Sequence, residues 1–359
     1  MASPSLGVVP GETTLAYEPP AAAVRIGSCR AIAGTSSWAD RSLVNDGSFY
    51  PSQSLTAGER LSYYAHRLPL TEVATSYRFP PTPEVSKRWV ANTPAGFTMD
   101  VRAWSLLSGA PTWPESLWQD LHGYVRPPRR EGAKLYKAHL PADVVDECWA
   151  RFGHALRPLR DAGRLGTVTF RYPSWFTPRA AAYEELAALP ARMAGYRTTV
   201  ELTSERWFER DTCEGTLELL EDLGLSLLVQ ASPRPAGQPR RRPVVAATSD
   251  IAVVRFSGRS WEEGRPWGPR EPPAQSPPGD AGPAEAHLAE TGPAEVRLGE
   301  SSSAAAWWSY RYSDEELQEW APAIRELASC TSEVHVVMDN SWKCDAVDNA
   351  AKLLDLLAD

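Results

Sequence analysis

The sequence predicts an α/β protein built as a single (β/α)8 TIM-like barrel, and two observations lead to that fold class. Eight short runs rich in β-branched and aliphatic residues alternate with amphipathic helical segments, which is the pattern of a parallel sheet. The chain also has 359 residues, 43% of them hydrophobic, so it is long and apolar enough for one barrel of roughly 250 residues with additional segments.

The predicted strands follow residues 1–25, where Pro, Gly, Ala and Ser occur without a period and a flexible N-terminal tail is expected. Residues 26–359 are assigned to the barrel domain. Its strands in chain order are Ala31–Thr35, Thr71–Ala74, Thr98–Arg102, Thr167–Arg171, Thr198–Thr203, Ser226–Gln230, Ile251–Ser257 and Val334–Asn340. Eight such strands separated by helices favour a parallel sheet that closes on itself.

Helical patterns fill the gaps between these strands. The predicted helices are Leu61–Leu68, Pro83–Asn92, Pro141–Asp161, Pro178–Arg192, Thr212–Leu223, Ser313–Ala328 and Ala346–Leu357. Three begin at a start signal, namely Thr82 with Pro83, Thr177 with Pro178, and the capping box of Ser313 and Glu316. The stretch Ala103–Val125 contains two prolines and predicts short helical pieces within a long loop.

One region interrupts the alternation between strands 7 and 8. Residues 262–306 are dense in Pro, Gly, Ala, Glu and Ser, and residues 282–291 are nearly repeated at 292–301. Such a composition buries too little apolar surface to offset the entropy lost on ordering. We therefore predict a disordered Pro/Gly-rich insertion, with an active-site lid as the alternative because the segment follows a strand on the loop side of the barrel.

Charge and cysteine content limit the partners and the compartment. With 37 basic and 45 acidic residues the net charge is −8, whereas nucleic-acid-binding proteins carry basic surfaces. The five scattered cysteines include no C-x-x-C pair, which favours a reducing compartment without disulfides or structural zinc. The sequence shows neither a membrane span nor a signal peptide. A cytoplasmic protein is expected, with no membrane association and with nucleic acid disfavoured as a partner.

The alternation of side chains along each strand places charged residues on one face. Since alternate residues of a barrel strand point into the lumen, same-face residues of different strands must meet near the axis. The predicted charged residues at the carboxyl ends are Glu72, Arg102, Arg171, Glu201, Arg255 and Asp339. Active sites of TIM barrels lie at that end.

This charged group has two interpretations. It forms either a structural lattice of buried ion pairs or a pocket in which arginines clamp a polar, anionic small molecule. In the second case the candidate acid/base residues are Glu72, Glu201 and Asp339, while Arg102, Arg171 and Arg255 bind the substrate. Aromatic residues recur just beyond the strands, at Trp38, Tyr77, Trp104, Trp175, Phe176, Trp207 and Trp342. They predict a stacking wall for a planar or sugar-like ligand, with core packing as the alternative.

Several chemistries are not supported by any motif. None of the six histidines lies at the carboxyl end of a strand, and no His, Cys and Asp cluster has metal-ligand spacing, so neither a metal nor a cofactor is expected. No lysine follows a strand before Lys343, which disfavours a Schiff base. Dinucleotide, Walker and nucleophile-elbow motifs do not occur.

The chain resembles the DUF72 (YecE-like) family. The resemblance is carried by segments in order, including Gly34–Trp38, Glu72–Pro80, Trp89–Phe97, Tyr172–Phe176 and Val253–Gly258, and it covers about Arg30–Arg259 and Tyr310–Leu357. It implies a TIM-like barrel with a polar pocket at the strand ends. Trp38, Glu72, Tyr77, Glu201, Arg255 and Asn340 match what the family usually shows, and Arg102 stands where a lysine is common.

Four departures from the family pattern face the same pocket, and a fifth lies on the last helix. Arg171 stands where the resemblance implies glutamine, Thr203 where it implies arginine, and Ser257 where it implies histidine. Asp339 replaces the first asparagine of a pair, and Asp348 replaces an arginine of the last helix. These changes predict altered chemistry, a new substrate or lost activity. Arg171 and Thr203 together are consistent with the relocation of one positive charge.

The function expected from these observations is that of a metal-independent enzyme acting on a polar, anionic or aromatic small molecule by acid/base or electrostatic catalysis. The full predicted substrate-binding set is Arg102, Arg171, Arg255, Trp38, Tyr77, Trp175, Trp207, Ser257 and Asn340. The alternatives are a non-catalytic ligand-binding or scaffold protein and, less favoured by the net charge, a nucleic-acid processing protein.

Overall fold

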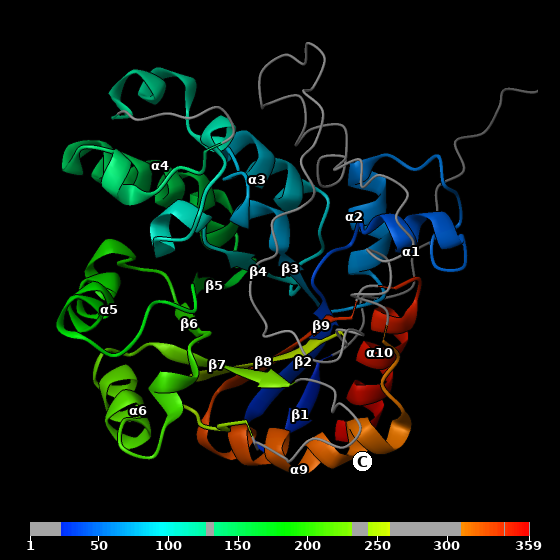
Figure 1. Cartoon of the computed structure of the whole chain (residues 1–359). Helices are drawn as coiled ribbons and strands as arrows, with labels where there is room; N and C mark the ends of the chain where they lie inside the picture. Colours follow the sequence, from blue (N-terminus) through cyan, green and yellow to red (C-terminus); the bar gives the residue numbers. More distant parts are fainter. Residues whose placement is uncertain (1–22, 127–132, 232–242, 259–309, 341, 359) are drawn as a thin grey trace, which may run out of the picture.

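A computed structural model describes residues 23–126, 133–231, 243–258, 310–340 and 342–358. Eight parallel strands, β2 to β9, pair in chain order, and β2 pairs with β9 to close the barrel (Figure 1). The predicted (β/α)8 fold is therefore confirmed. The predicted insertion at residues 262–306 and residues 1–22 of the predicted tail lie outside the described residues.

The barrel strands lie where the sequence predicts them, with ends displaced by at most two residues. They are β2 (Cys29–Thr35), β3 (Leu70–Val73), β4 (Thr98–Arg102), β5 (Leu165–Tyr172), β6 (Thr198–Leu202), β7 (Ser226–Ala231), β8 (Ile251–Ser257) and β9 (Glu333–Asp339). A ninth strand, β1 (Val24–Ile26), pairs antiparallel with β2 through a turn at Gly27, whose φ of 61° suits a tight hairpin. Val24 and Arg25 therefore belong to the sheet and not to the predicted tail.

Helices surround the barrel (Figure 1). Those of the described residues are α1 (Arg41–Asp46), α2 (Ala57–Ala65), α3 (Pro83–Ala91), α4 (Ala142–Asp161), α5 (Ala180–Arg192), α6 (Cys213–Asp222), α9 (Asp314–Cys330) and α10 (Asp345–Ala358). The capping box of Ser313 and Glu316 is confirmed, and Thr82 caps α3 by accepting a hydrogen bond from the Val85 amide. The start signal at Thr177 and Pro178 is wrong, because α5 begins at Ala180 without a side-chain cap.

The strands have two different faces. Outward-facing residues such as Val168, Phe170 and Val336 join the main core between the barrel and the helices. Inside the barrel, apolar side chains form two small clusters, one of Ile32, Leu70 and Val337 and one of Leu228, Ile251 and Val253. Since charged side chains alternate with these residues along β3, β8 and β9, much of the lumen is polar.

A bulge in β5 makes room for the buried carboxylate of Asp100. The pairing of β4 with β5 advances from Met99 opposite Leu165 to Val101 opposite Val168, so β5 carries one extra residue. A Cβ atom on Gly166 would lie 2.1 Å from Asp100 Oδ1 and 2.7 Å from His335 Cε1. Glycine is thus required where Asp100 approaches the β5 backbone and accepts a hydrogen bond from the Thr167 amide at 3.0 Å.

Candidate functional site

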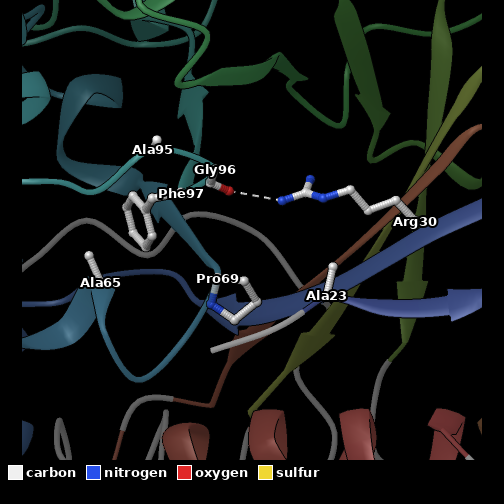
Figure 2. Close-up of a pocket in the computed structure, with 7 residues that line it drawn as sticks. All are labelled: Ala23, Arg30, Ala65, Pro69, Ala95, Gly96 and Phe97. Atoms are coloured by element: carbon white, nitrogen blue, oxygen red, sulfur yellow. Dashed lines mark hydrogen bonds between the residues drawn. The ribbon is translucent and has the colours of Figure 1, made fainter. Parts of the chain in front are cut away.

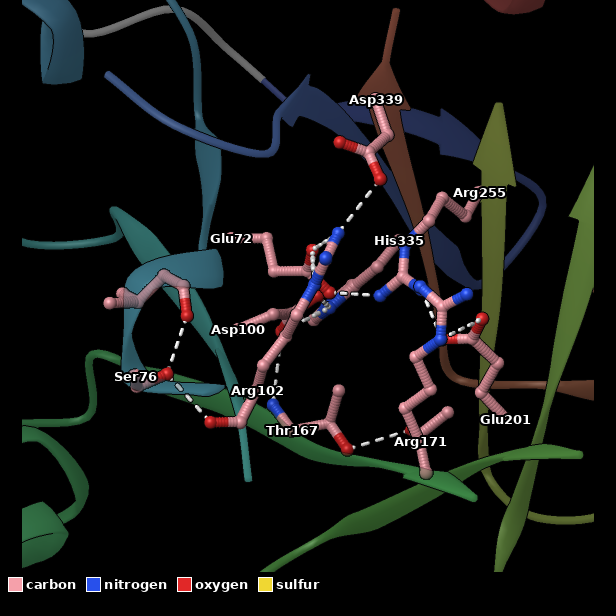
Figure 3. Close-up of polar contacts among 12 residues, drawn as sticks. Glu72, Ser76, Asp100, Arg102, Thr167, Arg171, Glu201, Arg255, His335 and Asp339 are labelled. Atoms are coloured by element: carbon pink, nitrogen blue, oxygen red, sulfur yellow. Dashed lines mark hydrogen bonds and ion pairs between the residues drawn. The ribbon is translucent and has the colours of Figure 1, made fainter. Parts of the chain in front are cut away.

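Six charged residues from six strands meet inside the carboxyl end of the barrel (Figure 3). This charged cluster consists of Glu72 on β3, Arg102 on β4, Arg171 on β5, Glu201 on β6, Arg255 on β8 and Asp339 on β9. All six were predicted to converge, and their convergence is confirmed by the ion pairs between them.

Each arginine of the charged cluster pairs with the carboxylates around it. Arg102 donates from Nε to Glu72 Oε2 at 2.6 Å and from Nη2 to Asp339 Oδ2 at 2.8 Å. Arg255 donates from Nη1 to Glu201 at 2.5 Å and from Nη2 to Glu72. Arg171 Nε lies 3.3 Å from Glu201 Oε1. Three guanidinium groups and three carboxylates thus balance one another, which is how proteins hold charges away from water.

Exposure divides the charged cluster into two levels. The side chains of Glu72, Arg255 and Glu201 are 0%, 2% and 5% exposed. Those of Arg102 and Asp339 are 12% and 14% exposed, and Arg171 reaches 27%. Only the second group reaches solvent from the carboxyl end. A ligand that approaches from solvent would therefore contact these three residues before the two glutamates.

The pKa values of two carboxyl groups favour the ionised form. Burial raises the pKa of Glu201, but the charges of Arg171, Arg255 and Arg102 lower it more, so the net shift is downward. The pKa of Asp339 is lowered in the same way, with burial opposed by Arg102 and Arg255 and a hydrogen bond from Ser36. Both groups are carboxylates at neutral pH. They are therefore poorly suited to donate a proton, and the acid role expected for them is not favoured.

Tyr77 lies near the charged cluster, and its contact with a ligand stays a prediction. It ends the short 3-10 turn η1 (Ala74–Tyr77) that follows β3, and Ser76 of this turn donates a hydrogen bond to the Arg102 carbonyl at 2.6 Å. Burial raises the pKa of Tyr77, and Arg171, Glu201 and Arg102 are the charges that act on it. We call Arg102, Arg171, Asp339 and Tyr77 the rim.

The predicted tryptophans do not form a common wall. Trp207 is completely buried, stacks on Phe176 and donates its indole N–H to the Phe176 carbonyl at 2.7 Å, so its predicted place in the pocket wall is corrected to core packing. Trp38 packs edge-on against Trp89 of α3, with 6.0 Å between ring centroids. Trp175 is 46% exposed in the loop after β5. Its role in binding stays a prediction.

Ser257 and Asn340 are buried and bonded to their surroundings. Ser257 accepts a hydrogen bond from the Gln230 amide, and its carbonyl accepts one from Tyr312 at 2.7 Å. Asn340 donates to the Tyr310 carbonyl at 2.6 Å and to Asn349 at 2.9 Å. Both residues fasten the ends of β8 and β9 to the segment before α9. Direct contact of either with a ligand stays a prediction.

The positions expected to depart from the family pattern have local partners. Thr203 donates its hydroxyl to the Tyr172 carbonyl at 2.8 Å, and Asp348 pairs with Arg311 at 2.9 Å. Arg171 supplies the charge beside Glu201. This arrangement is consistent with the proposed relocation of a positive charge from position 203 to position 171.

A second polar layer lies deeper in the lumen, and the predicted site did not include it. His335 on β9 faces Asp100 on β4 at 3.0 Å, and Glu333 at the start of β9 pairs with Arg197 at 2.7 Å and with Arg30 at 3.5 Å. Asp100 lies two residues before Arg102 and His335 four residues before Asp339, so both are on the inward faces of their strands. Both lie below the strand ends, so the pattern of charged residues at the carboxyl ends does not include them.

A separate small pocket lies at the opposite end of the barrel (Figure 2). Its wall includes Pro69, Phe97 and Arg30, and Arg30 donates to the Gly96 carbonyl at 2.9 Å. About 200 Å³ of space is available there, less than the 300–1,000 Å³ or so of usual ligand sites. Within the described residues no group of three or more His, Cys, Asp or Glu side chains could hold a metal ion, and no helix could span a membrane.

Fold and site together define a TIM-like barrel protein with a cluster of partly exposed charged residues at the carboxyl end of its lumen. The chain belongs to the family described as "Protein of unknown function DUF72", whose model matches residues 32–359. It is similar to the UPF0759 protein YunF of Bacillus subtilis (strain 168), with 23% identity over 325 residues that cover 90% of this chain and 93% of that protein.

Two solved structures of DUF72 family proteins share the fold. The protein of Enterococcus faecalis V583 matches with a TM-score of 0.63 and 17% identity, covering 91% of this chain and 95% of that one. The protein of Thermotoga maritima MSB8 matches with a TM-score of 0.59 and 20% identity, covering 92% and 99%. At these identities the likeness concerns the fold, and the chemistry has to be argued from the side chains.

Proposed function

We propose that the rim binds a small polar anion and that the protein is an enzyme that stabilises negative charge on this ligand. The observation that carries the proposal is the difference in exposure within the charged cluster. Arg102, Arg171 and Asp339 reach solvent, whereas Glu72, Glu201 and Arg255 do not. Buried ion pairs below an exposed set of charges hold that set in a fixed geometry, which a binding site requires.

The charges of the rim select the ligand. Two guanidinium groups and one carboxylate give the exposed residues a net charge of about +1, while the buried part of the charged cluster is about −1. An anionic group of the ligand is attracted to Arg171 and Arg102, whose planar donors suit carboxylate or phosphate. Asp339 accepts a hydrogen bond from a hydroxyl or ammonium group of the same molecule. The ring of Tyr77 offers an apolar edge beside them.

The pKa shifts favour electrostatic over acid/base catalysis. Because the pKa of Asp339 is lowered, its carboxylate is a weak base. Fixed guanidinium groups that face a developing negative charge need no proton transfer and lower the barrier by preorganisation. A metal-independent reaction of this type is the catalytic proposal. Binding without catalysis is the second candidate, since the same three carboxylates and three guanidinium groups already neutralise one another.

The proposal is tested by comparing Arg171→Gln with a matched control, Arg192→Gln. Arg192 on α5 pairs with Asp146 at 3.2 Å and is 37% exposed, so it is, like Arg171, a partly exposed arginine in an ion pair, but it lies outside the charged cluster. Thermal-shift screening of the full chain against carboxylate and phosphate metabolites identifies a stabilising compound. We expect Arg171→Gln to weaken its binding at least tenfold, or about 1.4 kcal/mol, and Arg192→Gln to leave it unchanged.

Two outcomes would contradict the proposal. Equal affinity in the wild type and in Arg171→Gln would place binding away from the rim, and equal losses in both variants would indicate a general charge effect. Turnover of the bound compound by the wild type, followed by chromatography, separates the enzyme from the binding protein.

A further inference from the structure

The imidazole of His335 is enclosed by carboxylates in the middle of the lumen. Its side chain is completely buried, and Nδ1 lies 3.0 Å from both carboxylate oxygens of Asp100. Nε2 lies 3.4 Å from Glu333 Oε2, close enough for an ion pair but longer than a normal hydrogen bond. Figure 3 shows His335 and Asp100 directly behind Arg102.

The charged groups near His335 come from three strands and from the residue that precedes a fourth. Asp100 belongs to β4 and Glu333 to β9. Arg197, just before β6, and Arg30 on β2 do not bond to the imidazole but pair with Glu333. β5 contributes Gly166, which has no side chain. A protonated imidazole therefore faces two carboxylates, of which only Asp100 has no arginine partner among the ion pairs described.

His335 and the rim are connected through the same two strands. β4 and β9 are not neighbours in the sheet, yet they are linked twice across the lumen. The lower link joins Asp100 to His335, and the upper link joins Arg102 to Asp339 at 2.8 Å. Asp100 lies two residues before Arg102 on the same face of β4. Asp100 and the arginine that holds Asp339 are therefore successive same-face residues of β4.

We propose that His335 is a positioning residue for the rim and that its protonation holds Arg102 on Asp339. With the imidazolium in place, the charge of Asp100 is neutralised within the lower link. When the Nε2 proton that faces Glu333 is lost, a neutral Nδ1–H still donates to Asp100, but the positive charge that balanced this buried carboxylate is gone. Asp100 is then a buried carboxylate without a cation, and it competes with Glu72 and Asp339 for Arg102.

The pKa of His335 agrees with this arrangement. Burial lowers it, but Asp100 and Glu333 raise it more, so the net shift is above its ordinary value of 6.5. A raised pKa means that the stabilisation by the imidazolium is complete below the ordinary value and is lost as the pH rises through the shifted one. The rim is thus expected to loosen as the pH rises through the raised pKa of His335.

The test follows His335 and Arg102 in one sample, without a ligand. The full chain labelled with 15N in histidine and arginine is titrated by NMR from about pH 5 to about pH 9. We expect the His335 ring signals to titrate with a midpoint above 6.5, and the Arg102 Nε–H signal to shift with the same midpoint. In His335→Gln, which keeps a donor for Asp100 but cannot titrate, the Arg102 shift should disappear. His154→Gln, at an exposed position of α4, should retain it.

A His335 midpoint at or below 6.5 would overturn the proposal, as would an Arg102 signal that stays constant while His335 titrates. If His335→Gln fails to fold, Glu333→Gln replaces it, and the midpoint of both signals should then fall. Any effect of pH on ligand affinity rests on the proposed function, whereas the Arg102 NMR signal is measured without a ligand and does not depend on it. A rim that binds no ligand is therefore distinguishable from a His335 whose protonation has no effect on Arg102.

Discussion

Arg255 and Arg171 both pair with Glu201, yet their surroundings differ. Arg255 is 2% exposed and contacts Glu72 as well, whereas Arg171 is 27% exposed. Loss of a buried partner leaves carboxylates that water cannot reach, and loss of a partly exposed partner is compensated by solvent. The two arginines therefore contribute differently to stability.

Arg255→Ala should lower the free energy of unfolding by about 3–5 kcal/mol, because Glu72 and Glu201 lose a buried cation. Arg171→Ala should cost less than about 1 kcal/mol. Urea denaturation of both variants measures the difference. Small losses of stability in both variants would mean that the lumen is solvated throughout, and that Arg255 belongs with the residues that bind a ligand.

Acid should weaken the charged cluster. Since the pKa values of Glu201 and Asp339 are lowered from 4.5 and 3.8, their contribution to stability is present above those values and is lost as the pH falls below them. Glu201→Gln should be less stable than the wild type at neutral pH, and the gap should narrow below about pH 4. A gap independent of pH in denaturation curves would contradict the lowered pKa of Glu201.

At the residue scale, the sequence predicted which charged side chains meet but not how deep they lie. Strand alternation is enough to bring Glu72, Arg102 and Asp339 to one face. Exposure depends on how neighbouring strands and loops cover each side chain, and no local pattern encodes this. For the same reason Trp207, which follows a strand as an active-site residue would, is buried by Phe176 and Tyr183.

At the element scale, β5 depends on one glycine. The bulge at Gly166 lets Asp100 approach the strand, and no other residue fits there without moving the carboxylate or His335. Gly166→Ala should therefore destabilise the protein by more than about 2 kcal/mol, as expected for overpacking next to a buried charge.

Gly153→Ala is the matched control for this substitution. Gly153 lies within α4, and a Cβ there would have no atom within 4 Å. Replacement should stabilise the protein by about 0.5–1 kcal/mol because alanine is the better helix former. Thermal unfolding of both variants is the measurement. Equal tolerance of the two substitutions would show that the bulge has room to adjust.

The predicted elements were correct where the sequence carries a specific motif or a pattern that repeats over several residues. The capping box of Ser313 and the strand Ile251–Ser257 are both examples. The hairpin strand β1 was missed because three residues before Gly27 carry too little periodicity to be told apart from a tail. The start of α5 was misplaced since a Thr-Pro pair also occurs in turns.

At the scale of the whole molecule, the closed sheet creates an interior that no single element contains. Two apolar clusters and two charged layers share the lumen, and cross-lumen pairs join strands that are not neighbours. Barrel closure could be predicted from the number and order of strands. The pairing of Asp100 with His335 could not, because it depends on the stagger of the strands.

Replacing residues 262–306 by a short Gly/Ser linker should change the melting temperature little. The expectation rests on composition and on the small entropic cost of loop length, about 0.6 kcal/mol per doubling. Thermal unfolding of the shortened chain is the measurement. A large fall in melting temperature would show that the segment packs on the barrel, and loss of ligand binding alone would favour the lid.

The most direct test of the proposed site is a crystal structure of the full chain soaked with the anionic compound that gives the largest thermal shift. We expect electron density at the carboxyl end of the barrel, with the anionic group on Arg171 and Arg102 and a donor group on Asp339. Density only in the pocket beside Arg30, or only on the outer surface, would contradict it.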